Sequence, residues 1–167
     1  MKTALAAEPS VSTLASRIYE SLLLPLEHIK QNPRYHPEGD VLYHSMQVFE
    51  LARDHVPYDE ELLLAALLHD VGKGIDPHDH VRSGLEALGG FITERTHWLI
   101  EHHMEAQLVL DGTLGVRAKR RLESDESFDE LMILARCDRE GRQCGVAVPE
   151  VDEALDYIRD LDHTFGI

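Results

Sequence analysis

The sequence predicts a single all-α domain, and three observations favour that class. Apolar residues recur at helical spacing in several segments, whereas the alternation typical of strands is not sustained anywhere. Clusters of glycine, proline and aspartate separate these segments. The 167 residues contain no evident repeat or linker and are enough to bury one substantial core. We therefore expect one compact bundle of about seven or eight helices over residues 1–167.

The first helices are predicted from apolar spacing and from the residues that interrupt it. Residues 10–30 have the pattern of a helix that packs on the rest of the domain, and Pro25 should kink it or begin a new one. The segment 31–40 is rich in helix breakers and should form a loop. Asp40 can then cap a helix from residue 41 to about residue 55.

The segment 62–74, LLLAALLHDVGKG, predicts the central helix of the domain. Before its first glycine, every residue is apolar except His69 and Asp70. A helix that is apolar all round is a buried helix, and a buried carboxylate is normally paired or bound to a metal. The glycines should end the helix, which leaves His69, Asp70 and Lys73 at the edge of the core. This arrangement is typical of an active site.

The second half of the chain predicts further helices separated by turns. The expected elements are a short helix ending near Leu88, a helix over residues 93–104, a basic amphipathic stretch to Leu122, a helix after Ser127, and a last helix from Pro149 to about residue 162. Ser127 and Glu130 form a capping-box pattern at the start of the fourth of these.

The formal charge of −15 argues against broad binding to nucleic-acid backbones, and we expect no long duplex partner. One local exception is a basic cluster formed by Arg117, Lys119, Arg120 and Arg121. Such a cluster is usually a solvated helix face and less often a phosphate-binding patch.

The sequence also bears on the cellular compartment. No apolar run approaches the roughly 18 residues of a membrane span, and the N-terminal residues fall short of a secretory signal. Cys137 and Cys144 do not form a disulfide framework. We therefore expect a cytoplasmic protein that does not bind membranes; its oligomeric state stays open.

Several polar residues occupy positions where apolar residues are expected. His44 lies on the inward-facing stripe of its helix, although a lone histidine there is more often a hydrogen-bonded core residue. Asp138 follows the apolar run LMILARC and repeats the pattern of His69 and Asp70; its alternative is an ion pair with a neighbouring arginine. Two histidines and two carboxylates from three apolar helices suit Mn, Fe, Co, Ni or Zn, with Mg as a further candidate.

These four residues carry a resemblance to a known family. In their order along the chain, His44, the His69–Asp70 doublet and Asp138 resemble the H…HD…D signature of the HD-domain metal-dependent phosphohydrolases. A bare HD dipeptide is a weak signal, but four ordered positions in predicted helices are a strong one. The resemblance implies an all-α HD domain in which these residues hold a metal ion.

Longer strings make the resemblance more specific. HPEGDVLYHS at residues 36–45, LLHDVGKG at residues 67–74 and ARCDREGR at residues 135–142 are similar to the HD domain attached to bacterial CCA-adding tRNA nucleotidyltransferases. The similarity covers roughly residues 33–160. Because the sequence lacks the nucleotidyltransferase domain of those enzymes, we expect no nucleotide-adding activity.

The family also suggests a second metal ion, which some HD enzymes hold with two further histidines. The candidates are His80 and His103, with His102 less favoured, and their alternative is ordinary surface histidines at helix ends. Asp70 would then bridge the two ions and serve as a catalytic residue. A cation held in this way activates water, and a pair of cations also stabilises both oxygens of an in-line displacement.

Three basic residues are candidates for binding substrate phosphate. Lys73 is the catalytic candidate, because it lies just beyond the ligand doublet; its alternative is a solvated lysine favoured by a helix C-terminus. Arg82 and Arg142 are secondary candidates. Glu38 and Glu101 are weaker candidates for proton transfer.

The favoured hypothesis is a phosphomonoesterase or phosphodiesterase that acts on nucleotides, cyclic nucleotides or RNA ends. The resemblance to CCA-adding enzymes is what points to RNA ends. One alternative is a non-catalytic sensor that binds a nucleotide through its metal. Another is a purely structural protein in which the histidines and aspartates only make hydrogen bonds and ion pairs.

Overall fold

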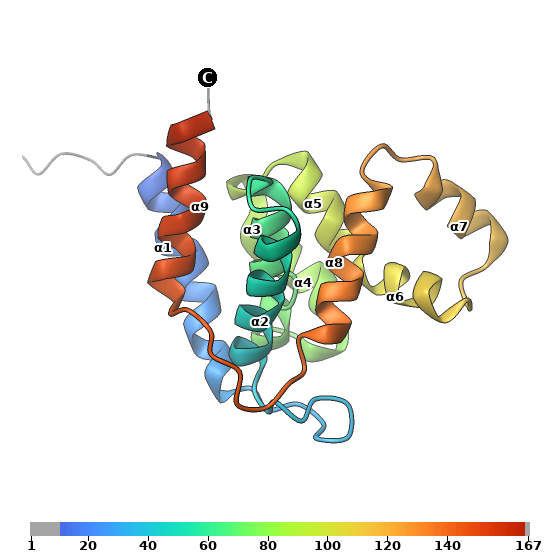
Figure 1. Ribbon diagram of the computed structural model, residues 1–167, viewed down its shortest axis with the longest axis horizontal. Helices are drawn as coiled ribbons and strands as arrows, with labels where there is room; N and C mark the ends of the chain where they lie inside the picture. Colours follow the sequence, from blue (N-terminus) through green and yellow to red (C-terminus); the bar gives the residue numbers. More distant parts are fainter. Residues whose placement is uncertain (1–10, 166–167) are drawn as a thin grey trace, which may run out of the picture.

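The computed structural model describes residues 11–165, and over that range the protein is all-α (Figure 1). Within these residues the only β-type pairing is an isolated bridge between Lys30 and Asp40. The α-helices are α1 (Val11–Leu23), α2 (Val41–His55), α3 (Glu60–Leu68), α4 (His80–Leu88), α5 (Glu94–Glu101), α6 (His103–Asp111), α7 (Val116–Glu123), α8 (Phe128–Glu140) and α9 (Val151–Phe165). The predicted fold class is therefore confirmed.

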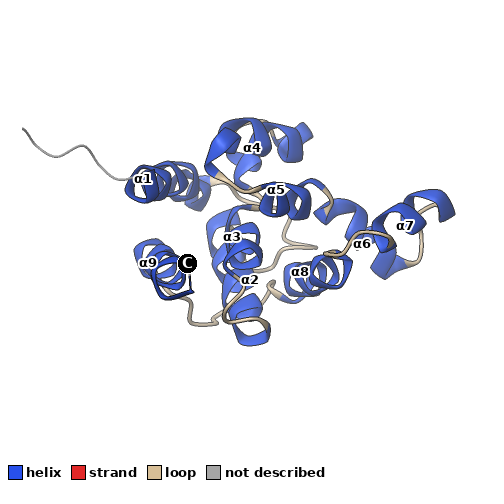
Figure 2. Ribbon diagram, turned by 90° about the horizontal axis from the view of Figure 1, so that it is seen from above, coloured by secondary structure: helices blue, strands red, loops and turns tan. Residues whose placement is uncertain are grey.

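Helix α3 lies at the centre of the bundle and is packed against α2, α5, α8 and α9. Helices α1 and α9 lie side by side at one end of the molecule, and α6 and α7 lie at the opposite end (Figures 1 and 2). All seven residues from Leu62 to Leu68 are buried, as expected for a helix that is apolar all round. The C-terminal end of α3 therefore lies in the interior of the bundle.

The capping predicted for α2 and the break predicted after α1 are confirmed. The side chain of Asp40 accepts a hydrogen bond from the backbone N–H of Tyr43 at 2.8 Å, which satisfies one donor of the first turn. Helix α1 ends at Leu23, and Pro25 lies in the first turn of a 3₁₀ helix that follows. Ser10, the predicted start of this segment, lies outside the described residues.

The helix predicted over residues 93–104 is wrong in one respect, because the structure has two helices there. The backbone of His102 leaves the helical region, with φ −103° and ψ 5°, and separates α5 from α6. The break turns the two adjacent imidazoles apart. His103 is buried, whereas His102 is partly exposed and hydrogen-bonds to Glu105 at 2.7 Å.

The capping box predicted at Ser127 and Glu130 is also wrong. Ser127 precedes α8, but its side chain makes no capping hydrogen bond. Instead its hydroxyl accepts a hydrogen bond from Arg95 Nε at 3.1 Å, and its backbone N–H donates to Asp125 Oδ1 at 2.8 Å. Glu130 lies 3.8 Å from the same arginine. A long-range ion-pair network therefore replaces the local motif.

The central helix ends earlier than its glycines indicate. Helix α3 ends at Leu68, and Val71–Gly74 forms a 3₁₀ turn. Gly72 is needed there because of a close approach: a Cβ at this position would lie 1.7 Å from the carbonyl oxygen of His80. The glycine thus lets the 3₁₀ turn pack against α4, which brings His80 close to the end of α3.

Among residues 11–165, no helix combines the length and the apolar character needed to cross a bilayer.

Candidate metal centre

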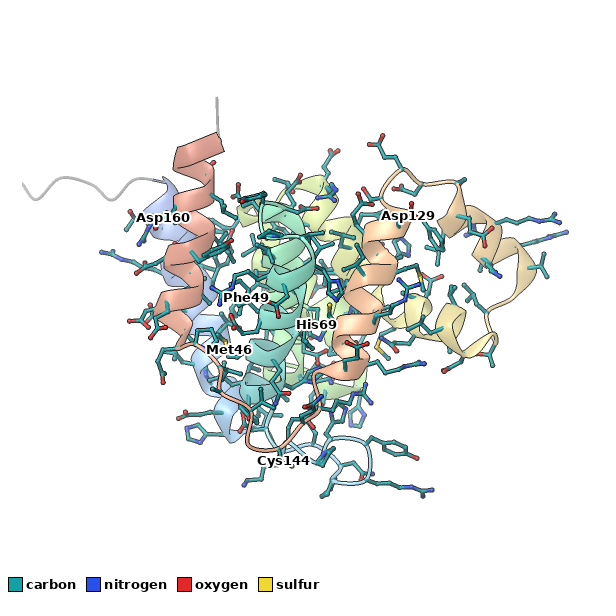
Figure 3. The ribbon with its side chains drawn as sticks, in the orientation of Figure 1. Met46, Phe49, His69, Asp129, Cys144 and Asp160 are labelled. Atoms are coloured by element: carbon teal, nitrogen blue, oxygen red, sulfur yellow. The ribbon has the colours of Figure 1, made fainter. Side chains whose placement is uncertain are left out.

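Four predicted ligands meet at the C-terminal end of α3. His44 comes from α2, His69 and Asp70 follow α3, and Asp138 comes from α8. All four are buried, with at most 6% of each residue exposed. Figure 3 places His69 in the interior of the bundle, beside α8. Side chains separated by up to 94 positions in the sequence therefore converge in one small volume.

The first group of ligand atoms consists of the Nε2 atoms of His44 and His69 and one carboxylate oxygen each from Asp70 and Asp138. His44 Nε2 lies 2.8 Å from Asp138 Oδ1, and His69 Nε2 lies 3.5 Å from the same oxygen. Asp70 Oδ2 lies 3.3 Å from His69 Nε2 and 3.9 Å from His44 Nε2. Potential ligand atoms of His44, His69 and Asp70 all lie within 4.8 Å of one another, a separation that one ion can bridge.

The second group forms on the other oxygen of Asp70. His80 Nε2 lies 3.4 Å from Asp70 Oδ1, and His103 Nε2 lies 3.6 Å from it. The two Nε2 atoms are 3.4 Å apart. Asp70, His80 and His103 are thus a second set of donors close enough to share an ion. The carboxylate of Asp70 has one oxygen in each group.

Three of these imidazoles turn Nε2 toward the carboxylates and Nδ1 toward a backbone carbonyl. An Nδ1 proton donated to that carbonyl leaves Nε2 as the atom that would bind a metal, whereas without a metal the contact of His44 Nε2 with Asp138 Oδ1, at 2.8 Å, needs a proton on Nε2 as well. The pairs are His44 with Gly141 at 2.8 Å, His69 with Ala66 at 2.8 Å, and His103 with Ile100 at 2.6 Å.

The buried Nε2 of His69 has no hydrogen-bond partner within the protein. Because buried polar atoms are nearly always satisfied, such an atom needs an explanation, and a bound cation supplies one. Neutral imidazoles and carboxylates are also the donors that divalent transition metals prefer. The residues present therefore fit a metal ion.

The electrostatics show how strongly the cluster attracts positive charge. Burial disfavours the charged form of His69, but the carboxylates of Asp70 and Asp138 outweigh it and raise its pKa to about 10. Burial also opposes ionisation of both acids, yet the adjacent His69 holds the pKa of each well below its usual range. At His80 burial prevails and lowers the pKa to about 4, which keeps this ring neutral and able to bind metal.

Behind His44 lies a carboxylate that sequence analysis considered only for proton transfer. Glu38 Oε1 lies 3.1 Å from His44 Nδ1 and 2.8 Å from His36 Nδ1, and the Glu38 side chain is fully buried. Its Oε2 has no partner. A carboxylate behind a ligating imidazole fixes the ring and strengthens it as a donor. His36 was missed, although the HPEGD string that contains both residues was noted.

Lys73 lies beside the cluster as predicted, but its ammonium group is engaged. Its Nζ donates to Asp70 Oδ2 at 2.9 Å and to Gln31 Oε1 at 2.9 Å. The side chain keeps 22% of its surface exposed. The lysine therefore connects the buried Asp70 to the surface, and Gln31 is a neighbour that sequence analysis missed.

Arg142 and Arg82 have different surroundings. Arg142 is near His36, since its charge helps to lower the pKa of that histidine after the larger effects of burial and Glu38. Its Nε is buried without a partner. Arg82 is largely exposed and pairs with Asp79 at 2.6 Å, and also with Glu86 on the same helix. Its partners lie outside the two ligand groups, and phosphate binding by either arginine stays a prediction.

Two further site predictions concern the helix pair α5 and α6. The partners of His102 are Glu101, Glu105 and Trp98, so its ring lies outside both ligand groups. Gln107, which sequence analysis missed, donates from Nε2 to Asp138 Oδ2 at 3.3 Å. It lies one turn after His103 on α6, a spacing that places both on one face. A correct prediction of α6 would have exposed that relationship.

The alternative considered for Asp138, an ion pair with a neighbouring arginine, is not what the structure has. Arg139 pairs with Asp111 at 2.9 Å, whereas Asp138 faces His44 and His69.

Comparison of the sequence with known proteins shows which family the chain resembles. A family model described as the HD domain matches residues 41–142, which contain both ligand groups. The Multifunctional CCA protein of Acidovorax sp. (strain JS42) is 30% identical over 136 residues, covering 68% of this chain and 32% of that protein. The protein of the same name from Nitrosospira multiformis is 28% identical over 164 residues, covering 80% and 38%.

A third relative, the Multifunctional CCA protein of Stenotrophomonas maltophilia (strain K279a), is 30% identical over 117 residues, covering 66% of this chain and 28% of that protein. The chain thus spans about a third of the length of these relatives. HD domains bind divalent metals, and the buried clusters of histidine and aspartate are suited to one. The match over most of the chain and the ligand geometry agree: the chain belongs to the HD-domain superfamily of metal-dependent phosphohydrolases.

Proposed function

We propose that this protein hydrolyses phosphate esters, with nucleotides, cyclic nucleotides or RNA ends as its substrates. The observation that carries the proposal is the position of the Asp70 carboxylate. Its Oδ2 faces His69 and its Oδ1 faces His80, at 3.3 and 3.4 Å. A carboxylate shared by two sets of donors is suited to bridge two cations, an arrangement common in phosphatases and nucleases.

In this proposal His44, His69, Asp70 and Asp138 would hold one cation, and Asp70, His80 and His103 would hold a second. When bound, such cations supply a hydroxide nucleophile at neutral pH and offset the charge that develops on the phosphate oxygens. The carboxylates offset the charge of the cations. With the cations bound, the backbone carbonyls of residues 66, 100 and 141 would accept the Nδ1 proton of three imidazoles, whose Nε2 atoms would then hold the metal.

Lys73 is proposed to bind a non-bridging oxygen of the substrate phosphate. Its ammonium group is already at the edge of the cluster, 2.9 Å from Asp70 Oδ2, and part of the side chain reaches solvent. An ammonium has three donors, and Asp70 and Gln31 use two of them. The third is available for a phosphate oxygen without loss of the contact that orients the side chain.

The substrate class follows from charge and from the relatives together. A net charge of −15 disfavours a long duplex, whereas a small phosphate ester needs only the local cations. The relatives are named Multifunctional CCA proteins, and the chain matches about a third of their length. That name makes RNA termini and nucleotides the substrates to test first.

The proposal is tested with protein purified without chelator and loaded with Mn, Co or Ni. A panel of p-nitrophenyl phosphate, bis(p-nitrophenyl) phosphate and 2′,3′-cyclic nucleotides is assayed for release of p-nitrophenol from the first two and for opening of the cyclic phosphate to a nucleoside monophosphate. We expect turnover that Asp70→Asn lowers by roughly a thousandfold or more, because bound metal contributes several kcal/mol to such reactions. Asp156→Asn on α9 is the matched control, since this acid pairs with Arg159 on the surface.

Metal-loaded protein that is inert toward the whole panel would contradict the proposal. A nucleotide that raises the melting temperature but survives incubation would instead favour the sensor hypothesis.

A further inference from the structure

Helix α7 carries a concentration of positive charge that the metal centre does not use. Four of its eight residues are basic, namely Arg117, Lys119, Arg120 and Arg121, and all four are exposed. The chain as a whole has a net charge of −15. The one buried residue of the helix is Leu122. Helix α7 therefore presents most of its surface to solvent, at the end of the molecule opposite α1 and α9 (Figure 1).

The arginines of α7 differ from several others in lacking carboxylate partners. Arg53, Arg95, Arg139 and Arg159 each form an ion pair with an acidic residue. Within α7, Lys119 lies 3.7 Å from Glu123. Among the described residues, no carboxylate oxygen lies within ion-pair distance of Arg117, Arg120 or Arg121. In so acidic a chain, the absence of such partners leaves three full charges available to a ligand.

Arg120 and Arg121 follow Arg117 by three and four residues, which places each of them beside Arg117 on the helical surface. Arg120 and Arg121 are consecutive, so they flank Arg117 on its two sides. Like charges at this spacing destabilise an isolated helix by a few tenths of a kcal/mol per pair. A series of phosphates bound along the face would remove that repulsion.

Beside this face lies a pocket of about 240 Å³ whose lining includes Trp98, His102 and Arg121 together with the acidic residues Glu105 and Asp125. The rings of Trp98 and His102 are in contact, with centroids 5.0 Å apart. Trp98 is half-buried, so part of its indole ring is accessible from the pocket. An aromatic surface next to an arginine is the combination by which proteins bind single-stranded nucleic acid, through base stacking and phosphate contacts.

The pocket and the arginine face are close to the metal centre along the sequence. His102 precedes His103, whose Nε2 lies 3.6 Å from Asp70. From His103, the nine residues of α6 extend toward α7, a length of about 13 Å. A strand of a few nucleotides is long enough to contact α7 and still place its end near the cluster.

We propose that Arg117, Arg120 and Arg121 bind the sugar–phosphate backbone of a single-stranded RNA, with one base held in the Trp98 pocket. This inference deepens the proposed function, on which it rests, by naming an RNA strand as the substrate that the metal centre receives. A long duplex fits less well, because it would need many phosphate contacts and the chain as a whole carries a net charge of −15.

The binding test uses a short fluorescein-labelled oligoribonucleotide with chelator present, so that no hydrolysis occurs. The triple variant Arg117→Ala, Arg120→Ala, Arg121→Ala should bind it roughly 10- to 100-fold more weakly. The slope of log affinity against log salt should fall by about 2, since three phosphate contacts are lost. The matched control is Arg17→Ala, Arg53→Ala, Arg159→Ala, which removes the same charge from α1, α2 and α9. Thermal melts confirm that both variants are folded.

Trp98 provides a second readout, because it is the only tryptophan in the chain. RNA should quench its fluorescence, whereas inorganic polyphosphate, which has no bases, should not. Equal loss of affinity in both triple variants would overturn the proposal, since the effect would then be one of total charge. Polyphosphate that binds as tightly as RNA and quenches Trp98 equally would overturn it as well.

Catalysis separates this inference from the proposed function. The α7 triple variant should hydrolyse bis(p-nitrophenyl) phosphate at the wild-type rate, and Asp70→Asn should bind RNA normally while hydrolysing nothing. RNA binding by wild-type protein that hydrolyses neither RNA nor any ester of the panel would reject the proposed function alone. Hydrolysis of small esters without RNA binding would reject the role of α7 alone.

Discussion

The polar side chains at the two ends of helix α3 differ in whether they have hydrogen-bond partners within the protein. At the N-terminal end, Asp59 accepts a hydrogen bond from Leu62 N–H at 3.0 Å and pairs with Arg95 through both oxygens, at 2.7 and 2.8 Å. At the C-terminal end, His69 Nε2 is buried with no hydrogen-bond partner. Polar groups that stabilise the fold find partners within the chain, whereas this nitrogen at the candidate metal centre is buried without one.

The difference matters because an unsatisfied buried polar atom costs roughly 1–3 kcal/mol. A fold tolerates that cost where a ligand removes it, as the proposed cation would at His69. Variants at the two ends of α3 should therefore have separate effects, on metal binding and catalysis at one end and on stability at the other.

After Asp70→Asn, the largest effect is expected from a matched pair of adjacent histidines. His103→Asn should remove a ligand of the second cation, lower metal content from about two ions per chain to about one, and reduce turnover by roughly a hundredfold. His102→Asn should change neither quantity, because His102 pairs with Glu105 outside the cluster. Metal analysis and steady-state kinetics measure both outcomes. Equal losses of metal and of turnover in the two variants would show that the break between α5 and α6 does not determine which of the two histidines binds the metal.

A smaller effect is expected behind the cluster. Glu38→Gln keeps the shape of the side chain but removes the charge that faces His44 Nδ1 at 3.1 Å. Metal affinity should fall roughly tenfold, as is usual when the partner of a ligating histidine is changed. Competition with a chelator of known affinity measures this change. Unchanged metal affinity, together with a lowered melting temperature in the metal-free protein, would assign Glu38 a structural role only.

The smallest effect is expected at the other end of α3. Asp59→Ala should lower the free energy of unfolding by about 1–2 kcal/mol through loss of the helix cap, and leave metal affinity and turnover of folded protein unchanged. Denaturant melts measure the stability difference. A loss of metal binding in folded Asp59→Ala protein would show that the two ends of α3 are not independent.

The same variant has a pH dependence with a definite sign. Burial opposes ionisation of Asp59, but hydrogen bonds from Arg95 and Leu62 prevail and lower its pKa. A carboxyl whose pKa is lowered by folding stabilises the protein above its ordinary pKa, near 4, and loses that contribution as pH falls through the folded value. The stability difference between wild type and Asp59→Ala should therefore be full at pH 7 and shrink as pH falls from 5 to 3. A difference that grows under acid would contradict this assignment.

The elements that could be predicted from the sequence depend on local signals. Asp40 caps α2 through a residue three positions away, and the apolar run of α3 determines its own burial. The break at His102 was missed because the segment 93–104 has no proline or glycine to mark it. The capping box failed because Arg95, 32 positions away, binds the hydroxyl of Ser127. Such long-range competition has no sequence signature.

The residues of the candidate site likewise divide into those that a local sequence pattern indicates and those that only tertiary contacts bring to the site. His44, His69, Asp70 and Asp138 were predicted because each is a polar residue in an apolar helical pattern, and the structure brings all four together. Gln31, His36 and Gln107 were missed because their positions are unremarkable for loop or helix surface. They reach the cluster through tertiary contacts, and only the folded chain reveals those contacts.

The metal content of the protein tests the central claim most directly. Protein purified without chelator is dialysed against Mn, Co, Ni and Zn, and bound metal is quantified by mass spectrometry beside the Asp70→Asn variant. The account predicts at least about one tightly bound ion per wild-type chain, and loss of that ion in Asp70→Asn. Folded wild-type protein that retains none of the four metals would contradict it.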